Sequence, residues 1–214
     1  MKTQTNLLNL LLVLALFGFV SCDDSDTTEE IVPLVEETAF DVPADPDMSG
    51  GFTYFSFENG IVDSTQANSD AWDLAFSGTT ILTNGGASGP GQGAGLVVAG
   101  IFENVSEVQE NELKIDAEGS PAIQGSDSQV ENVPGWYTYT GEAPSGPQRA
   151  IIAVPGRVII VKTAKGNFAK MEILSYYEGN PDTTTDEFAN FATRPASRHY
   201  TFRYVVQKNG GNVF

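Results

Sequence analysis

Residue types that catalyse reactions or bind metals are scarce in this chain. His199 is the only histidine, so no second histidine can complete a metal-binding pair, and no Ser-His-Asp arrangement surrounds it. Paired carboxylates can hydrolyse glycosidic bonds, but the acidic residues of the first strand-like runs occupy positions typical of turns and exposed faces. These residues are Glu58, Asp63, Asp70 and Asp73. We therefore predict a protein that is not an enzyme, with no catalytic residue and no metal site.

A glycine-rich stretch, Thr83–Gly95, invites comparison with phosphate-binding loops. Such a loop needs Gly-Lys-Ser/Thr at the start of a helix, and a dinucleotide fingerprint also needs a following helix. This stretch has no lysine and leads into Leu96-Val97-Val98, which is typical of a strand. We predict that it binds no nucleotide and that its glycines allow two backbone segments to pack closely.

The only cysteine, Cys22, follows an apolar run close to the N-terminus. Lys2 precedes this run, Leu7–Val20, which is shorter than the roughly 20 apolar residues that a bilayer requires. A positive start, a short apolar stretch and small residues are typical of a secretory signal. Val20-Ser21-Cys22 resembles the bacterial lipobox, in which the cysteine is acylated, for example with palmitate. We predict a signal peptide over 1–21 and a lipid anchor on Cys22.

Charge is distributed unevenly along the chain. The formal net charge is −17, and ten of the eleven basic residues lie from Lys114 onward. Nucleic acid is therefore excluded as a partner, because phosphate binding needs clustered Lys and Arg. The acidic segment 22–48 is predicted to be a flexible tether. Its start, Cys-Asp-Asp-Ser-Asp, resembles the export signal of lipoproteins on the outer face of the Bacteroidetes outer membrane. We predict surface display there, with a periplasm-facing anchor as the alternative.

Short strand-like runs follow the acidic segment. Phe52–Phe57 precedes Asn59-Gly60, which predicts a hairpin with a type I′ turn. In 71–76, large apolar side chains alternate with smaller or acidic ones, which predicts one buried and one mostly exposed face. Lys165-Gly166-Asn167 separates the runs 157–162 and 168–177 and predicts a second hairpin.

The end of the chain completes the predicted fold. His199–Gln207 is predicted to be the last strand, and Asp186–Ala192 a short helix capped by Thr185. We predict an all-β fold with mostly antiparallel sheets and few short helices. It forms a single domain over 49–209, followed by a C-terminal tail over 210–214. The cysteine count excludes disulfides, so the fold depends on one hydrophobic core.

Several motifs, in the same order and spacing from Phe52 to Gln207, resemble the HmuY-like haem-binding lipoproteins of Bacteroidetes. They are Tyr54-Phe55-Ser56-Phe57, Trp72-Asp73-Leu74-Ala75-Phe76, Thr83-Asn84-Gly85-Gly86, Ser88-Gly89, Gly91-Gln92-Gly93, Gly135-Trp136, Arg157-Val158-Ile159-Ile160-Val161, Ala164-Lys165-Gly166-Asn167-Phe168-Ala169-Lys170 and Tyr200-Thr201-Phe202-Arg203-Tyr204. The resemblance implies an antiparallel β fold that holds haem between two loops. It also implies a TonB-dependent outer-membrane receptor as partner.

The chain departs from the family at the iron ligands. In the family, paired histidines or methionines come from the loops before and after the Gly-Trp. The corresponding stretches here, Asp116–Gln129 and Tyr137–Pro147, contain neither residue. Met171 and His199 match positions of a core side chain and a strand, so we predict packing roles for both.

Tyrosine is the remaining candidate for an iron ligand, since tyrosinate binds ferric haem. Tyr137 and Tyr139 lie two apart and would share one face of a strand beside Trp136. Arg149 could pair with a haem propionate. These four residues are the predicted ligand-binding candidates. Two functions stay open: capture of haem or a related ligand for the receptor, or binding of a peptide, glycan or partner protein by the same fold.

Overall fold

The computed structural model describes residues 34–127 and 133–214. Cys22, the predicted signal peptide and the start of the predicted tether lie outside the described residues. Within the described ranges, no helix is long and apolar enough to cross a membrane.

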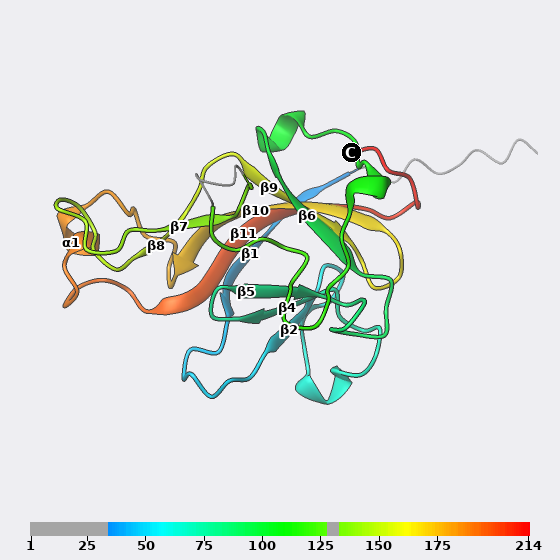
Figure 1. Cartoon of the computed structure of the whole chain (residues 1–214), viewed down its shortest axis with the longest axis horizontal. Coiled ribbons are helices and arrows are strands. Elements are labelled where there is room, and N and C mark those ends of the chain that lie inside the picture. The colour runs from blue at the N-terminus through cyan, green and yellow to red at the C-terminus, as the bar shows by residue number, and fades with distance from the viewer. Residues whose placement is uncertain (1–33, 128–132) are drawn as a thin grey trace, which may run out of the picture. The chain divides into compact units, whose positions relative to one another are not determined.

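Two antiparallel sheets and a separate hairpin make up the fold (Figure 1). The five-stranded sheet has the order β1 (Glu36–Pro43), β11 (Ser197–Gln207), β10 (Phe168–Tyr177), β9 (Arg157–Lys162) and β6 (Ala94–Ala99). The four-stranded sheet has the order β3 (Gly60–Val62), β2 (Thr53–Ser56), β4 (Leu74–Ser77) and β5 (Thr80–Thr83). The hairpin pairs β7 (Tyr137–Tyr139) with β8 (Ile151–Ala153). The short helices are η1 (Ser64–Gln66), η2 (Phe102–Asn104), η3 (Glu110–Glu112) and α1 (Asp186–Ala189). The prediction of an all-β antiparallel fold with few short helices is confirmed.

Aromatic side chains fill the space between the two sheets. Phe55 on β2 and Phe76 on β4 lie against Phe202 on β11, with ring centroids 5.2 and 5.7 Å apart. The ring of Tyr200 on β11 lies tilted against that of Phe76, with 4.9 Å between the ring centroids. Such rings bury large apolar areas and add geometric preference to the packing. This aromatic layer joins the two sheets into one core.

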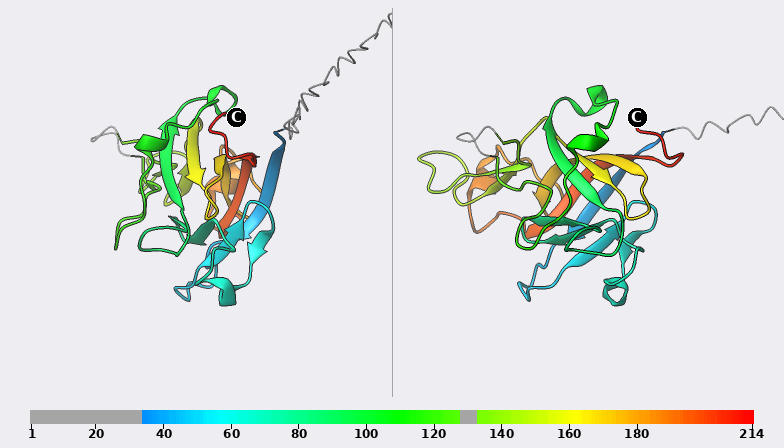
Figure 2. Two further views of the ribbon diagram at one scale, coloured as in Figure 1. Left: turned by 90° about the vertical axis from the view of Figure 1, so that its right-hand side faces the viewer. Right: turned by 45° about the vertical axis from the view of Figure 1, so that its right-hand side comes forward.

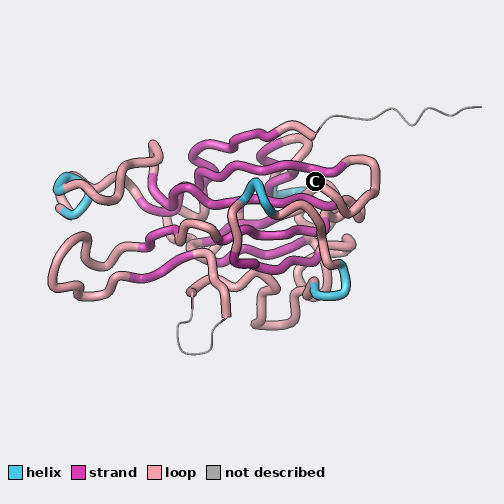
Figure 3. The backbone as a smooth tube through the Cα atoms, turned by 90° about the horizontal axis from the view of Figure 1, so that it is seen from above, coloured by secondary structure: helices cyan, strands magenta, loops and turns pink. Residues whose placement is uncertain are grey.

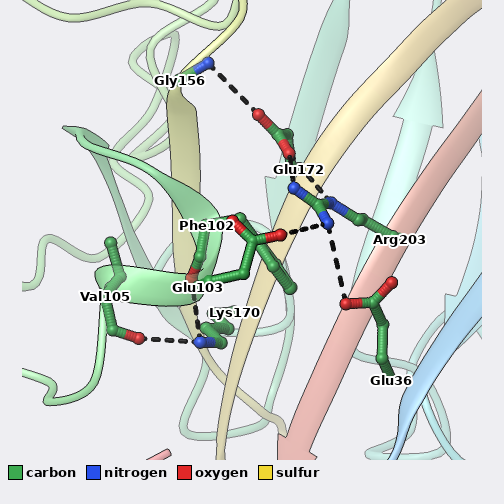
Figure 4. Close-up of polar contacts among 8 residues, drawn as sticks. All are labelled: Glu36, Phe102, Glu103, Val105, Gly156, Lys170, Glu172 and Arg203. Atoms are coloured by element: carbon green, nitrogen blue, oxygen red, sulfur yellow. Dashed lines mark hydrogen bonds and ion pairs between the residues drawn. The ribbon is translucent and has the colours of Figure 1, made fainter.

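The other face of the five-stranded sheet carries buried charges (Figure 4). Lys170 donates to the carbonyl oxygens of Phe102 and Val105 at 2.9 and 2.8 Å. Arg203 donates to the carboxylates of Glu172 and Glu103, in each case at 2.7 Å. These bonds satisfy the cations as they leave water. The segment around η2 is thereby held over β10 and β11.

The C-terminal segment packs on this same face and does not form the separate tail predicted over 210–214. The backbone N–H of Phe214 donates to Ser106 O at 2.8 Å, and that of Val108 donates to Asn212 O at 2.8 Å. Gln207 donates to Val213 O at 2.6 Å. The tail therefore belongs to the domain.

β1 corrects the prediction of a flexible tether that reaches residue 48. Glu36–Pro43 pair with β11 at the edge of the five-stranded sheet, and Figure 2 shows the two strands side by side. Glu37 accepts a hydrogen bond from the Tyr204 hydroxyl at 3.0 Å. The acidic composition suggested a segment without a core partner, but backbone pairing with β11 orders it.

Both faces of β4 are buried, whereas alternation predicted one mostly exposed face. Asp73 and Ala75 are buried, like Leu74 and Phe76. The Asp73 carboxylate accepts hydrogen bonds from Phe57 N at 2.9 Å and from Ala164 N at 3.0 Å. Burial raises the pKa of Asp73 above its usual value. The prediction that the Asp73 side chain is exposed was wrong, because segments distant in sequence cover it.

Both predicted hairpins form, but the first uses a different turn. Ser56 pairs with Gly60, so the loop has three residues, 57–59, and not two. Gly60 has a φ of 73°, whereas Asn59 has no positive φ. Three-residue loops are the next most common hairpin connections after the two-residue primed turns. Gly166, with a φ of 90°, lies within the loop 163–167 between β9 and β10, and its N–H donates to Thr163 O at 3.0 Å.

The glycine-rich stretch is a close crossing of backbones, as predicted. Asn84, which is fully buried, lies at its centre. Its amide donates to Ser69 O and Trp72 O at 2.9 and 2.8 Å, and its carbonyl oxygen accepts from Gly91 N at 3.0 Å. A Cβ on Gly85 would lie 2.0 Å from the carbonyl oxygen of Gly93.

We expect Gly85→Ala to lower the free energy of unfolding by about 3 kcal/mol, because the added methyl group overlaps a backbone atom. Urea denaturation measures the loss. The matched control is Gly51→Ala, whose Cβ would meet only Ser49 Oγ at 3.4 Å. It should change stability by no more than about 0.5 kcal/mol. Equal stability of the two variants would contradict the crossing.

Candidate functional site

The candidate site is the end of the fold formed by the β7–β8 hairpin, its loop 140–150 and the segment around α1. Figure 3 shows this loop and the α1 segment projecting from the sheets at the same end. The hairpin lies on the five-stranded sheet, since Ile151 N donates to the Tyr177 hydroxyl at 3.1 Å. Loops on a rigid scaffold are common places for binding residues.

The two loops that the family resemblance singles out do meet. Tyr137 N donates to Gly125 O at 3.1 Å, and Asp127 N donates to Tyr137 O at 2.7 Å. Asp127 also accepts from Gly135 N and forms a bidentate pair with Arg157 on β9, at 3.1 and 3.2 Å. This pair, with little exposure on the Asp127 side, fixes the base of the first loop. Residues 128–132 of that loop lie outside the described residues.

Trp136 belongs to the core and not to the surface. Only 1% of it is exposed, and its ring lies 4.6 Å from that of Tyr137, 5.3 Å from Tyr200 and 6.0 Å from Tyr176. Its indole Nε1 is buried without a hydrogen-bond partner among the described residues. A ligand could contact Trp136 only if the hairpin moved. The sequence identified an aromatic loop but not which of its rings faces inward.

Tyr137 and Tyr139 lie on one side of β7, as their spacing predicted. Tyr137 is half-buried beside Trp136, while Tyr139 is 57% exposed opposite Ile151 of β8. Tyr139 is therefore the phenol that an external ligand can reach.

Arg149 precedes β8 with a φ of 50°. Its guanidinium pairs with the carboxylate of Glu142 across the loop, with Nε 2.6 Å from Oε1, and both side chains are largely exposed. Among the described residues, no hydrogen bond or ion pair joins Arg149 to Tyr139. A propionate would have to displace Glu142 to reach it.

Arg194 is a residue of this end that sequence reasoning missed. It donates to Phe188 O at 2.8 Å and to Gln148 O at 2.9 Å, and its guanidinium stacks on Phe191 at 4.6 Å. It thus joins the α1 segment to the hairpin loop. No local motif marks such a role, because the partner on the hairpin loop is a backbone carbonyl 46 residues away.

The helix beside Arg194 is shorter than predicted. It covers Asp186–Ala189, with Thr185 accepting from Phe188 N at 3.2 Å as its N-cap. Asn190 ends it in an extended conformation, and its side chain accepts from Ala192 N at 3.0 Å. Asparagine competes for backbone groups in this way and so shortens helices.

Buried tyrosines of β10 and β11 pack against the β7–β8 hairpin. Burial raises the pKa of Tyr176 to about 12 and also raises the pKa of Tyr177. Tyr200, fully buried, has its pKa raised by the same cause and donates to Gly78 O at 2.9 Å. All three phenols therefore stay neutral and serve as packing and hydrogen-bonding groups.

Comparison with known proteins identifies the family. The family model described as HmuY protein matches residues 50–204. The chain belongs to the HmuY family. The match starts just before β2, so β1 lies outside it.

One solved structure resembles this chain in fold, and two further solved structures are similar to it at lower scores. The apo HmuY analog of Tannerella forsythia has 14% identity and a TM-score of 0.50, covering 85% of this chain and 100% of that one. A protein of Bacteroides vulgatus described as HmuY-like and heme-binding has 14% identity, a TM-score of 0.42 and coverages of 79% and 90%. A protein of Bacteroides fragilis described as a lipoprotein has 16% identity, a TM-score of 0.37 and coverages of 79% and 89%. No curated protein matches the chain.

The HmuY-type clamp of two histidines or two methionines does not fit this end of the fold. Neither loop contains those residues. Met171 is fully buried in the core, and the ring Nδ1 of His199 lies 3.0 Å from Ser197 O on β11. Among residues 34–127 and 133–214, no group of three or more His, Cys, Asp or Glu side chains could hold a metal ion. Tyr139 carries an oxygen that suits ferric iron and is exposed to solvent.

A shallow pocket lies near the first loop but does not include the four candidates. Its volume is about 440 Å³, and Thr80, Leu82, Ala117 and Glu118 are among its lining residues. None of Trp136, Tyr137, Tyr139 and Arg149 lines it.

We expect Arg194→Ala to loosen the hairpin loop from the α1 segment, because three donated hydrogen bonds and two ring contacts are lost. Amide hydrogen exchange over residues 141–149 should become faster, which corresponds to a local stability loss of about 2 kcal/mol.

Arg149→Ala is the matched control, since it removes only an exposed ion pair worth less than about 1 kcal/mol. Its exchange rates over 141–149 should stay near those of the parent. Equal protection in both variants would show that Arg194 does not hold the loop.

Proposed function

We propose that this protein is a non-catalytic lipoprotein of the cell envelope that captures haem or a related tetrapyrrole at the β7–β8 end. It then delivers the ligand to a TonB-dependent receptor. The HmuY family is a family of the haem-binding type, and its model matches residues 50–204. Capture requires no reacting groups, which agrees with the scarcity of catalytic residue types in the chain.

The observation that carries the proposal is the exposed Tyr139 on the hairpin of a HmuY-family scaffold. Tyrosinate is a known axial ligand of haem iron, and Tyr137 beside it offers an aromatic face for the macrocycle. Arg149 would reach a propionate after exchange of Glu142, because guanidinium pairs favourably with carboxylates.

A second candidate function is supported by a specific observation. The loops lack His and Met, and the Arg149 guanidinium already has an acidic partner. Both facts favour a ligand without iron, such as a peptide, a glycan or a partner protein. The same end of the fold would then bind by its exposed aromatic and polar groups.

Titration of haemin into the full chain, purified in mild detergent, separates the two candidates. The first predicts a shifted Soret band that is lost in Tyr139→Phe, because the phenolate oxygen is gone. His199→Ala is the control and should bind like the parent, since its ring faces the β11 backbone. Absence of a Soret shift in the parent would reject haem capture and leave the second candidate. An unchanged shift in Tyr139→Phe would show that haem binds without Tyr139 and would reject this residue as the iron ligand.

We also infer that Cys22 carries the membrane anchor after removal of residues 1–21. Residues 22–35 then link the lipid to β1, and the remaining described residues form one domain. Two or more acyl chains give stable anchoring. The acidic segment after Cys22 supports display on the outer face of the outer membrane.

Cys22→Ala should abolish incorporation of labelled palmitate and release the protein from the membrane fraction. Protease treatment of intact cells should digest the parent protein if it is displayed on the surface. The parent protein would survive this treatment if the anchor faced the periplasm. A Cys22→Ala protein that kept the label would contradict the lipid assignment.

A further inference from the structure

A second pocket lies away from the candidate site, between the ends of the two sheets. Its volume is about 230 Å³, and it opens between the β2–β3 hairpin, the loop before β4, the β9–β10 turn and the end of β11. Figure 1 shows the β9–β10 turn, in yellow, on the opposite side of the fold from α1, β7 and β8. The pocket is therefore separate from the proposed capture site.

Charges of opposite sign lie on opposite walls of this pocket. The wall from the four-stranded sheet and its loops carries Glu58, Asp70 and Asp73. The wall from the five-stranded sheet carries Lys165 and Lys208. Two of the chain's few basic residues therefore lie on one wall of this small pocket, opposite a wall with three acidic residues.

Some of the charged groups that line this pocket already have partners within the protein. The Asp73 carboxylate, at the base, accepts from Phe57 N and Ala164 N, and this ties the two walls together. Lys165 and Glu58 form a loose exposed pair at 3.6 Å. These contacts shape the pocket without filling it.

Asp70 and Lys208 have no ion-pair partner within the described parts of the chain, although they line the same pocket from opposite walls. The side-chain amide of Asn167, on the Lys208 wall, also makes no hydrogen bond among residues 34–127 and 133–214. One wall thus offers a free acceptor and the other offers free donors. This arrangement suits a ligand with separated charges.

We propose that the pocket binds a small zwitterion, an α-amino acid or a short peptide. Its ammonium group lies against Asp70, and its carboxylate lies against Lys208 and Asn167. Charge-assisted hydrogen bonds of this kind are stronger than neutral ones. A neutral ligand such as a sugar would remove water from both charges without neutralising either of them.

The size of the pocket agrees with this class of ligand. At about 230 Å³ it is smaller than the roughly 300–1,000 Å³ typical of sites for drug-sized molecules. Phe57, Ala71 and Val206 give the pocket a small apolar part. That part suits a methyl or methylene side chain and not a large ring.

Isothermal titration calorimetry on the full chain tests the proposal with uncapped and capped probes. Alanine, Ala-Ala and Ala-Ala-Ala carry both charges and differ in the distance between them, so the tightest of them identifies the source as a free amino acid or a peptide. N-acetyl-Ala-Ala lacks the ammonium, and Ala-Ala-amide lacks the carboxylate. We expect each capped probe to bind at least about tenfold more weakly than Ala-Ala.

Variants of the two free charges assign the site. Asp70→Asn and Lys208→Gln should each weaken Ala-Ala binding about tenfold, because each removes one charge-assisted contact. Glu187→Gln and Lys114→Gln change the same charges outside the pocket and should leave binding unchanged. Absence of binding by every uncapped probe would overturn the proposal. Equal binding of capped and uncapped Ala-Ala, or unchanged binding in both pocket variants, would overturn it as well.

Discussion

Hydrogen bonding of buried backbone groups is the constraint on which this fold depends. Irregular segments cross between the sheets, and their N–H groups cannot reach water, so each needs a partner. Asp73, Asn84 and Asp116 supply these partners. The Asp116 carboxylate accepts from Thr83 N at 2.9 Å and from Ala122 N at 2.7 Å, while Asp73 joins the two sheets. These polar side chains allow the glycine-rich crossing to be buried.

The two ends of the fold differ as a consequence. At the end with the pocket lined by Asp70 and Lys208, buried carboxylates and glycines hold backbone segments in close contact. At the other end, a two-stranded hairpin rests on β10 and on buried tyrosines. Arg194 joins its loop to α1. A rigid frame with a projecting hairpin is suited to binding, because loops can vary while the sheets keep their packing.

The scaffold is that of the HmuY family, but the groups that would hold iron differ. Fold and function are separable in this way, because a site consists of a few side chains on a frame that many sequences can build. Tyr139 places an exposed phenol at the edge of β7, whereas Trp136 is part of the core. The Arg149 guanidinium is already paired with Glu142.

The sequence by itself determined the antiparallel strands, both hairpins, the glycine crossing and the cap at Thr185, because these depend on neighbouring residues and on local φ preferences. It also showed the absence of His and Met from both loops. Only the tertiary structure decided that Asp73 and Trp136 are buried, that β1 is ordered, that Arg194 reaches Gln148, and that Asp70 and Lys208 line one pocket. Each of these features depends on contacts between segments that are distant in the chain. The periodicity of one strand does not indicate which segments will cover that strand.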